Sequence, residues 1–135
     1  MNDESIVIVA IRSDADIIAA RQQGRQIAAS LGFTSTEQAL IATAISEVAR
    51  NIVEYAQKGE ITIQAFSERG KHGILVQARD QGPGIADLDL AMQDGYSTSN
   101  SLGLGLPGTK RLMDEFDITS EIGKGTTVTM KKWRY

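Results

Sequence analysis

The stretch AISEVARNIVEYAQKGEI, residues 44–61, joins a helical pattern to the start of a strand. Thr34 and Glu37 form a capping box before it, so we expect one long helix from there to about Gln57. The apolar residues of this helix recur at three- and four-residue spacing, which is typical of a buried stripe. They are Ile41, Ile45, Val48, Ile52 and Ala56. Gly59 is expected to end the helix, and a β-rich run follows.

Two elements are predicted ahead of the long helix. Residues 5–11 have the composition of a strand. Ser13 offers an N-cap for a helix that runs to about Leu31, and Gly32 supplies its C-terminal stop.

Four further strands are predicted after the long helix, in two hairpin pairs. They cover residues 60–67 and 73–80, with a polar loop at 68–72, and residues 116–122 and 126–133, with a turn at 123–125. The residues between the pairs favour helices at 86–93 and 104–115 and a small-polar loop at 95–102. Because the strands do not alternate strictly with helices, we predict an α+β two-layer sandwich with helices on one face of a mixed, mainly antiparallel sheet.

Length and composition limit the class of protein. A chain of 135 residues fits one compact domain, residues 1–135. The absence of cysteine excludes disulfides, thiolate metal sites and a cysteine nucleophile, and the net charge of -3 argues against non-specific nucleic-acid binding. The acidic N-terminus has no signal-peptide pattern, and no apolar run approaches the ~20 residues of a membrane span. We therefore expect a cytoplasmic protein that binds neither nucleic acid nor membranes.

Glu47 and Asn51 are the first candidate site residues. They lie four residues apart on the long helix, so their side chains project from one face beside the buried Val48 and Ile52. One interpretation is a solvated helix flank. The other is a magnesium site, because Mg²⁺ takes one or two protein oxygens and leaves its other positions to phosphates and water.

The run ARDQGPGI contains the second candidate cluster, Asp80, Gly82 and Gly84. A tight turn alone would explain an acid followed by two glycines that flank Pro83. Alternatively, the carboxylate accepts a hydrogen bond from an exocyclic amine such as that of adenine, and the glycines let the backbone approach a flat ring.

The third cluster is Gly103, Gly105 and Gly108 in SLGLGLPGTKRL, where a polar loop meets a predicted helix. Backbone N–H groups at a helix start can bind an anion such as phosphate. The stretch also matches the dinucleotide motif GxGxxG, but residues 95–101 before it do not form a strand pattern. A dinucleotide-binding fold is therefore disfavoured.

Gly123, Gly125 and Thr126 are the last cluster. By themselves they predict only a hairpin turn, although the threonine hydroxyl could reach a base edge. The ordered set Glu-xxx-Asn, Asp-x-Gly-x-Gly, glycine-rich loop and Gly-x-Gly-Thr is far more specific than any of its members.

This ordered set resembles the GHKL superfamily of ATP-binding domains, the Bergerat fold shared by gyrase and sensor histidine kinases. Within it, the chain is most similar to stand-alone anti-sigma-type serine/threonine kinases, in particular the switch kinases of stressosomes. The motifs that carry the resemblance are AISEVARNIVEYAQKGEI (residues 44–61), DQGPGI (80–85) and GYSTSNSLGLGLPGTKRLMDEF (95–116).

The resemblance implies a role for each matched residue. Asn51 would ligate the Mg²⁺ of ATP, Glu47 would orient or deprotonate the substrate hydroxyl, and Asp80 would bind the adenine amine. The adenine pocket would be completed by Gly82, Gly84 and Thr126, and the phosphate lid would comprise Gly103, Leu104, Gly105, Leu106 and Gly108. Lys110 and Arg111 are the cations nearest to the lid in sequence and either could reach a phosphate, so Lys110 is counted among the predicted ATP-binding residues. Sequestering anti-sigma kinases carry an arginine just ahead of the lid glycines, whereas residues 95–101 contain no base, so the γ-phosphate cation stays open.

The resemblance also implies a function. The protein would use Mg-ATP to phosphorylate STAS-domain antagonist or scaffold proteins and, once released, would bind and activate a PP2C-type phosphatase. The alternatives are an anti-sigma factor kinase that binds a sigma factor directly, and a non-catalytic module in which ATP only gates partner binding. His72 is expected to be an exposed loop residue, and Lys131, Lys132 and Arg134 a solvated strand end, with partner docking as the other interpretation.

Overall fold

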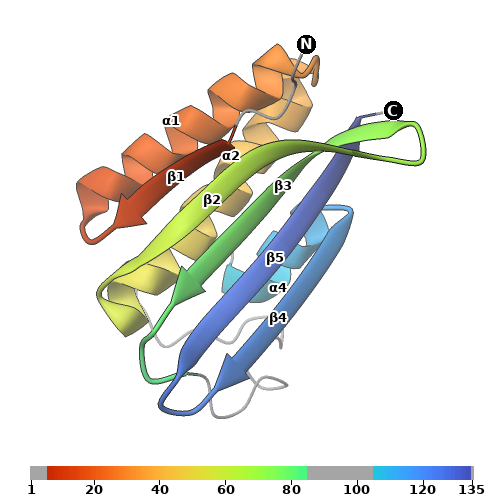
Figure 1. The fold of residues 1–135 in the computed structure, drawn as a ribbon. Helices are drawn as coiled ribbons and strands as arrows, with labels where there is room; N and C mark the ends of the chain where they lie inside the picture. The colour runs from red at the N-terminus through yellow and green to blue at the C-terminus, as the bar shows by residue number, and fades with distance from the viewer. Residues whose placement is uncertain (1–5, 85–104, 135) are drawn as a thin grey trace.

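A computed structural model describes residues 6–84 and 105–134 and shows two layers, one of helices and one of strands (Figure 1). The elements in chain order are β1 (Ile6–Ile11), α1 (Asp14–Ser30), α2 (Ser35–Asn51), the π-helical turn η1 (Ile52–Ala56), β2 (Gly59–Glu68), β3 (Lys71–Asp80), α4 (Gly105–Leu112), β4 (Glu115–Glu121) and β5 (Gly125–Arg134).

The five strands form one sheet in the order β1-β2-β3-β5-β4. Every pairing in the described part of the chain is antiparallel, so the predicted parallel component of a mixed sheet is not found there. The α-helices of the described residues, α1, α2 and α4, lie on the same face of the sheet (Figure 1). The predicted α+β sandwich is confirmed.

The core lies between the sheet and the helices. Strand alternation sends every second side chain to the helical side, and the register aligns these side chains in apolar rows across the sheet. Two such rows are Val7, Ile63, Val76, Met130 and Phe116, and Val9, Ile61, Ala78, Val128 and Ile118. The predicted stripe of the long helix meets them, because Ile41, Ile45 and Val48 of α2 and Ile52 of η1 are buried, while Ala56 of η1 is half-buried.

The two long helices begin where the sequence predicts, through different contacts. At α2, Thr34 Oγ1 accepts from the Glu37 amide and Glu37 Oε1 accepts from the Thr34 amide, so the capping box is confirmed. At α1, Ser13 occupies the N-cap but makes no side-chain cap bond; Asp16 instead accepts from the Arg12 amide. No helix within the described ranges is long and apolar enough to cross a bilayer.

The end of the long helix differs from the prediction. After Asn51 the helix widens into the π turn η1, and Gln57 ends it in a left-handed conformation with φ 71°. Gly59 was expected to end the helix, but it is the first residue of β2. Glycine fits there because a Cβ would lie 3.0 Å from Ile52 Cγ2 and 3.1 Å from Asp80 Cβ.

The β2–β3 hairpin is tighter than expected. Its turn is at Arg69 and Gly70, which both have positive φ, so His72 is an exposed residue of strand β3 rather than of a loop. At the end of β5, Arg134 is exposed, but Lys131 and Lys132 are half-buried, so the prediction of a solvated strand end is wrong for both lysines.

The predicted helix over 104–115 is shorter in the structure, because Glu115 already begins β4. The predicted helix at 86–93 and the loop at 95–102 lie outside the described residues.

Candidate nucleotide site

Glu47 and Asn51 lie at the C-terminal end of α2, where the helix passes into the π turn. Glu47 is only 7% exposed, so the solvated-flank interpretation is wrong for this carboxylate. Asn51 is half-buried, and α4 packs against α2 on the same face of the sheet (Figure 1). A carboxylate and a carboxamide are thus held at the margin of the core, close to the start of the next strand.

Asp80 is the last residue of β3, and the backbone holds its carboxylate in place. Its Oδ1 accepts hydrogen bonds from the amides of Gly82, at 2.9 Å, and Thr126, at 3.2 Å. Among the described residues no donor reaches Oδ2. The carboxylate is therefore oriented through one oxygen, and its other oxygen has acceptor capacity that no described donor uses.

The glycines near Asp80 allow backbone segments to pack closely. A Cβ on Gly82 would lie 2.6 Å from the Ala56 Cβ, and one on Gly84, at φ 80°, would lie 2.5 Å from the Glu121 carbonyl oxygen. Gly125 has φ 116°, and a Cβ there would overlap the Asp80 carbonyl. Their close neighbours are protein atoms, so the structure gives these glycines a packing reason in addition to the predicted approach of a ring.

Two residues that the sequence analysis did not assign to the site support its walls. Ala56, at the end of the π turn, packs against Gly82. The Ser120 hydroxyl lies 2.8 Å from the Thr126 hydroxyl and donates to the Gly125 carbonyl at 3.2 Å. A Gly-x-Gly-Thr motif signals a turn, but which side chain across the hairpin meets the threonine depends on strand register.

The lid residues are described only in part. Gly103 and Leu104 lie outside the described residues, and Gly105 is the first residue of α4. Leu106 and Gly108 are buried in the first turns of α4, and Pro107 between them has no N–H to offer an anion. Lys110 is exposed in the last turn, about 7.5 Å along the axis from the helix start at 1.5 Å per residue.

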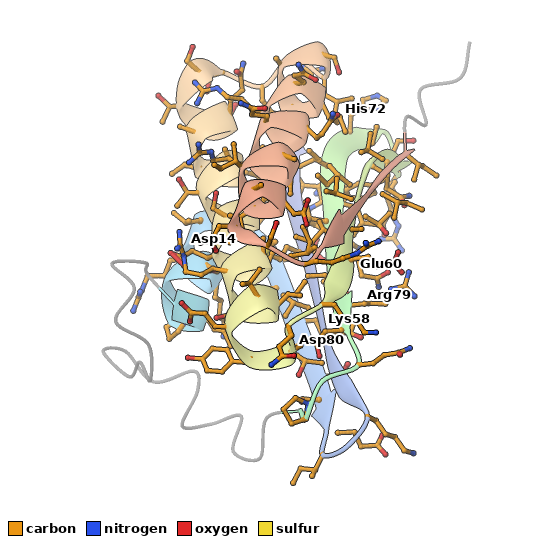
Figure 2. The ribbon with its side chains drawn as sticks, turned by 90° about the vertical axis from the view of Figure 1, so that its left-hand side faces the viewer. Asp14, Lys58, Glu60, His72, Arg79 and Asp80 are labelled. Atoms are coloured by element: carbon orange, nitrogen blue, oxygen red, sulfur yellow. The ribbon has the colours of Figure 1, made fainter. Side chains whose placement is uncertain are left out.

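The structure brings together all four residues that were predicted to bind adenine. Asp80, Gly82, Gly84 and Thr126 meet at one end of the sheet, beside the π turn that follows Asn51 (Figure 2, where Asp80 is labelled). Lys110 does not belong to this group. It lies in the C-terminal turn of α4 rather than at the start of that helix.

This geometry agrees with the sequence comparisons. The histidine kinase-like ATPase domain family matches residues 12–132. The chain belongs to this family. Serine/threonine-protein kinase RsbT of Bacillus subtilis is 55% identical over 133 residues, which cover 98% of each chain. An anti-sigma F factor of Thermoanaerobacter is 38% identical over 112 residues, covering 78% of this chain and 77% of that protein. The chain is therefore placed among protein serine/threonine kinases with an ATP-binding domain.

Solved structures show the same fold. The RsbU and RsbW domains of a Mycobacterium tuberculosis protein match 99% of this chain with a TM-score of 0.68 and 20% identity, and this chain corresponds to 34% of that one. The mycobacterial sensor histidine kinase MprB matches with a TM-score of 0.57 and 13% identity, over 96% of this chain and 97% of that one. The predicted GHKL fold is confirmed.

Proposed function

We propose that this kinase transfers the γ-phosphate of Mg-ATP to a serine or threonine of a STAS-domain protein in a bacterial stress-response cascade. Released from that substrate, it binds and activates a PP2C-type phosphatase in the cytoplasm. A single GHKL domain over residues 1–135 carries out both the phosphotransfer and the binding of the phosphatase. Full-length likeness to a serine/threonine kinase supports the reaction, and likeness to an anti-sigma factor supports a role in partner exchange. The observation that carries the proposal is the buried Glu47 next to Asn51, at the same end of the sheet as Asp80.

Asp80 selects the base in this mechanism. Its Oδ1 is occupied by the amides of Gly82 and Thr126, and its Oδ2 accepts a hydrogen bond from the adenine amine. Guanine presents no amine at the corresponding position and would leave the acceptor unpaired, which disfavours it. Gly82, Gly84 and the oriented Thr126 hydroxyl complete the pocket.

Glu47 and Asn51 act at the transfer end. Bound Mg-ATP supplies the phosphoryl group together with the metal charge that offsets its negative oxygens. Asn51 contributes its carboxamide oxygen to the magnesium, which accepts few protein ligands. Glu47 accepts the proton of the serine or threonine hydroxyl while the hydroxyl oxygen bonds to the γ-phosphorus and the bond to ADP breaks. Its burial keeps water from competing with the hydroxyl.

The start of α4 binds the phosphates in this proposal. Backbone N–H groups of the lid, from Gly103 to Gly108 except Pro107, donate to phosphate oxygens, favoured by the positive end of the helix dipole. Leu104, Gly105 and Leu106 belong to this stretch. Lys110 reaches a phosphate only if its side chain folds back along α4, since it lies in the last turn.

Phosphorylation explains release of the substrate. A phosphoserine or phosphothreonine adds nearly two negative charges at the interface with the kinase. The repulsion and desolvation cost that this charge adds loosen the complex and free the kinase for its second partner.

The test is phosphotransfer from γ-labelled ATP with Mg²⁺ to a STAS-domain protein, comparing wild type with Asn51→Asp. We expect label on serine or threonine from the wild type and none from the variant. Gln22→Glu, an amide-to-acid change on the exposed side of α1, is the matched control and should transfer normally. Normal transfer by Asn51→Asp would overturn the metal assignment.

The same preparation separates the alternatives. ATP binding by the wild type without any transfer would favour the ATP-gated binding module. A pull-down that recovers a sigma factor and no STAS-domain protein would favour a direct anti-sigma factor, which the Thermoanaerobacter relative makes a specific alternative.

A further inference from the structure

The sheet face opposite the helices carries a buried tryptophan. No helix within the described ranges covers that face (Figure 1), yet Trp133 of β5 is only 7% exposed. The register places Phe66, Gly73 and Trp133 in one row across β2, β3 and β5, and alternation sends this row away from the helices. Side chains of the open face itself must therefore bury the indole.

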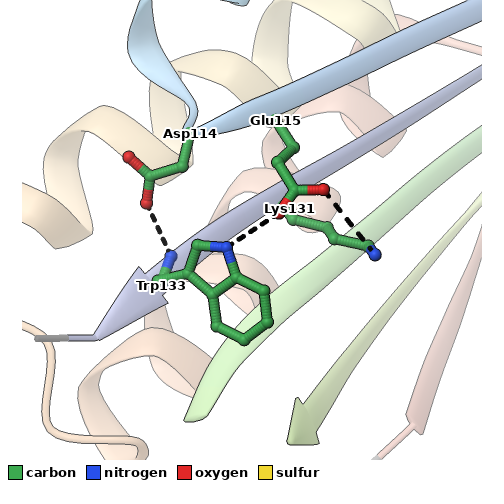
Figure 3. Close-up of polar contacts among 4 residues, drawn as sticks. All are labelled: Asp114, Glu115, Lys131 and Trp133. Carbon is green, nitrogen blue, oxygen red and sulfur yellow. Dashed lines mark hydrogen bonds and ion pairs between the residues drawn. The ribbon is translucent and has the colours of Figure 1, made fainter. Parts of the chain in front are cut away.

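Four contacts hold Trp133. Its ring centroid lies 4.7 Å from that of Phe66 at an interplanar angle of 55°, and the Lys71 Nζ lies 5.6 Å above its ring. Its Nε1 donates to Glu115 Oε2 at 2.9 Å, and its backbone N–H donates to Asp114 Oδ2 at 2.7 Å (Figure 3).

Glycine in the middle of the row makes the aromatic pair possible. A Cβ on Gly73 would lie 3.0 Å from Phe66 Cε1 and 3.3 Å from Trp133 Cε3. The two rings thus meet directly across β3. We call Phe66, Lys71, Lys131 and Trp133 the distal surface.

The distal surface lies at an end of the sheet that has more positive than negative side chains. The cations are Arg69, Lys71, Lys131, Lys132 and Arg134, and the described acids are Glu68, Asp114 and Glu115. Lys131 Nζ lies 5.4 Å from the Phe66 ring and 3.8 Å from Glu115 Oε1, whereas no described carboxylate pairs with the exposed Lys71. Asp114 and Glu115 keep their negative charge, and hydrogen bonds from the N–H groups of Trp133 fix one oxygen of each. Arg69 and Arg134 are exposed at the same end of the sheet, and none of the described acidic residues forms a salt bridge with them.

The distal surface is far from the candidate nucleotide site. Lys71 begins β3 and Asp80 ends it, so the two lie about 30 Å apart at 3.3 Å per residue. Figure 2 shows His72, next to Lys71, at the opposite end of the molecule from Asp80. A partner bound at the distal surface therefore leaves the phosphotransfer end open.

We infer that the distal surface docks an acidic segment of the protein partner that is not the phosphate acceptor, which in the proposed function is the phosphatase. Carboxylates of the segment pair with Lys71 and Lys131, and an apolar side chain lies against the half-exposed edge of Phe66. Aromatic residues framed by cations are typical of interface hot spots, and side chains already fixed in place lose little entropy on binding. The inference rests on the proposed function for the identity of the partner.

The experiment compares Lys71→Glu with Arg25→Glu. Both residues are exposed and both changes shift the charge by the same amount, but Arg25 lies on α1 in the helical layer. Binding of each full-length variant to a PP2C-type phosphatase is measured by calorimetry at low and high salt. Phosphotransfer to the STAS-domain protein is measured in parallel.

We expect Lys71→Glu to bind the phosphatase about tenfold more weakly at low salt, with a smaller difference at high salt, while transfer stays within about twofold of wild type. Lys71→Met, which keeps the aliphatic stem over the indole, should lose part of the affinity and most of the salt dependence at this site. Arg25→Glu should bind as the wild type does.

Equal phosphatase binding by Lys71→Glu and Arg25→Glu would overturn the inference while leaving the kinase assignment intact. So would sedimentation that shows wild-type dimers which Lys71→Glu abolishes, because a second copy would then occupy the surface. A wild type that transfers no phosphate, yet binds the phosphatase in a Lys71-dependent way, would instead overturn the proposed reaction and support the docking surface.

Discussion

The two ends of the sheet hold carboxylates in comparable ways but leave them in different states. At the nucleotide end, Asp80 accepts two backbone hydrogen bonds through Oδ1, and no described donor reaches Oδ2. At the distal end, Asp114 and Glu115 accept from the backbone and indole N–H groups of Trp133. In the proposed function, Asp80 uses its second oxygen to bind a ligand, whereas the other two carboxylates anchor an aromatic residue. The proposed function thus contrasts a polar group that serves binding with polar groups that serve packing.

The largest effect should follow from adding a side chain to Gly125, which packs against the Asp80 backbone. Gly125→Ala would place a methyl group on the Asp80 carbonyl at φ 116°, so we expect a loss of about 3 kcal/mol or more in the free energy of unfolding. Gly70→Ala is the control, since it has φ 82° but no atom within 4 Å, and should lose about 1 kcal/mol. Urea denaturation measures both, and equal losses would contradict the packing reason.

The next effect concerns the free oxygen of Asp80. Asp80→Asn keeps the Oδ1 acceptor but replaces Oδ2 by an N–H donor, which meets the adenine amine unfavourably. We expect about a 100-fold loss of ATP affinity, or roughly 2.7 kcal/mol, with a change of under about 1 kcal/mol in stability. Calorimetric titration with Mg-ATP measures the loss of affinity. Asp117→Asn, an exposed change on β4, should bind as wild type.

A smaller effect is expected where the carboxylates are already satisfied. Trp133→Phe retains an aromatic ring on Phe66 but removes the Nε1 hydrogen bond to Glu115. Because this bond is half-buried, we expect a loss of about 1 kcal/mol in unfolding free energy and no change in ATP affinity. A matching loss of ATP affinity would mean that the two ends are coupled.

The smallest effect should come from the hydroxyl pair at the nucleotide end. Ser120→Ala removes the hydroxyl 2.8 Å from that of Thr126, so the threonine loses one orienting contact. We expect a loss of about 0.5 kcal/mol in the binding free energy of Mg-ATP, roughly a twofold weaker affinity. Ser67→Ala, at an exposed position of β2, is the matched control and should leave the affinity for Mg-ATP unchanged.

The sequence predicts those parts of the fold whose physics is local. The Thr34 and Glu37 box lies within one helical turn, and the apolar stripe of α2 follows from spacing alone, so both are confirmed. Asp80 and Gly82 are likewise close in the chain. The motif order also leads to the family, because four short motifs in sequence are rarely met by chance.

Features that depend on distant contacts could not be predicted. The bond from Thr126 to Asp80 spans 46 residues and requires the register of β3 with β5. The contact of Trp133 with Phe66 across β3 depends on strand register, and a Cβ at Gly73 would crowd both rings. The burial of Glu47 similarly depends on elements brought against α2 by the fold, which helical spacing cannot reveal.

The π turn η1 sets an angular offset between two groups of residues. A π-helical turn contains more residues than an α-helical turn, so it arises when one residue is inserted into a regular helix. Glu47 and Asn51 precede the turn, whereas Ala56, which packs on Gly82, follows it. A single-residue deletion within the turn would rotate one group against the other without shortening either. The length of this segment, more than the identity of its residues, therefore sets the rotation of Glu47 and Asn51 relative to Ala56 about the helix axis.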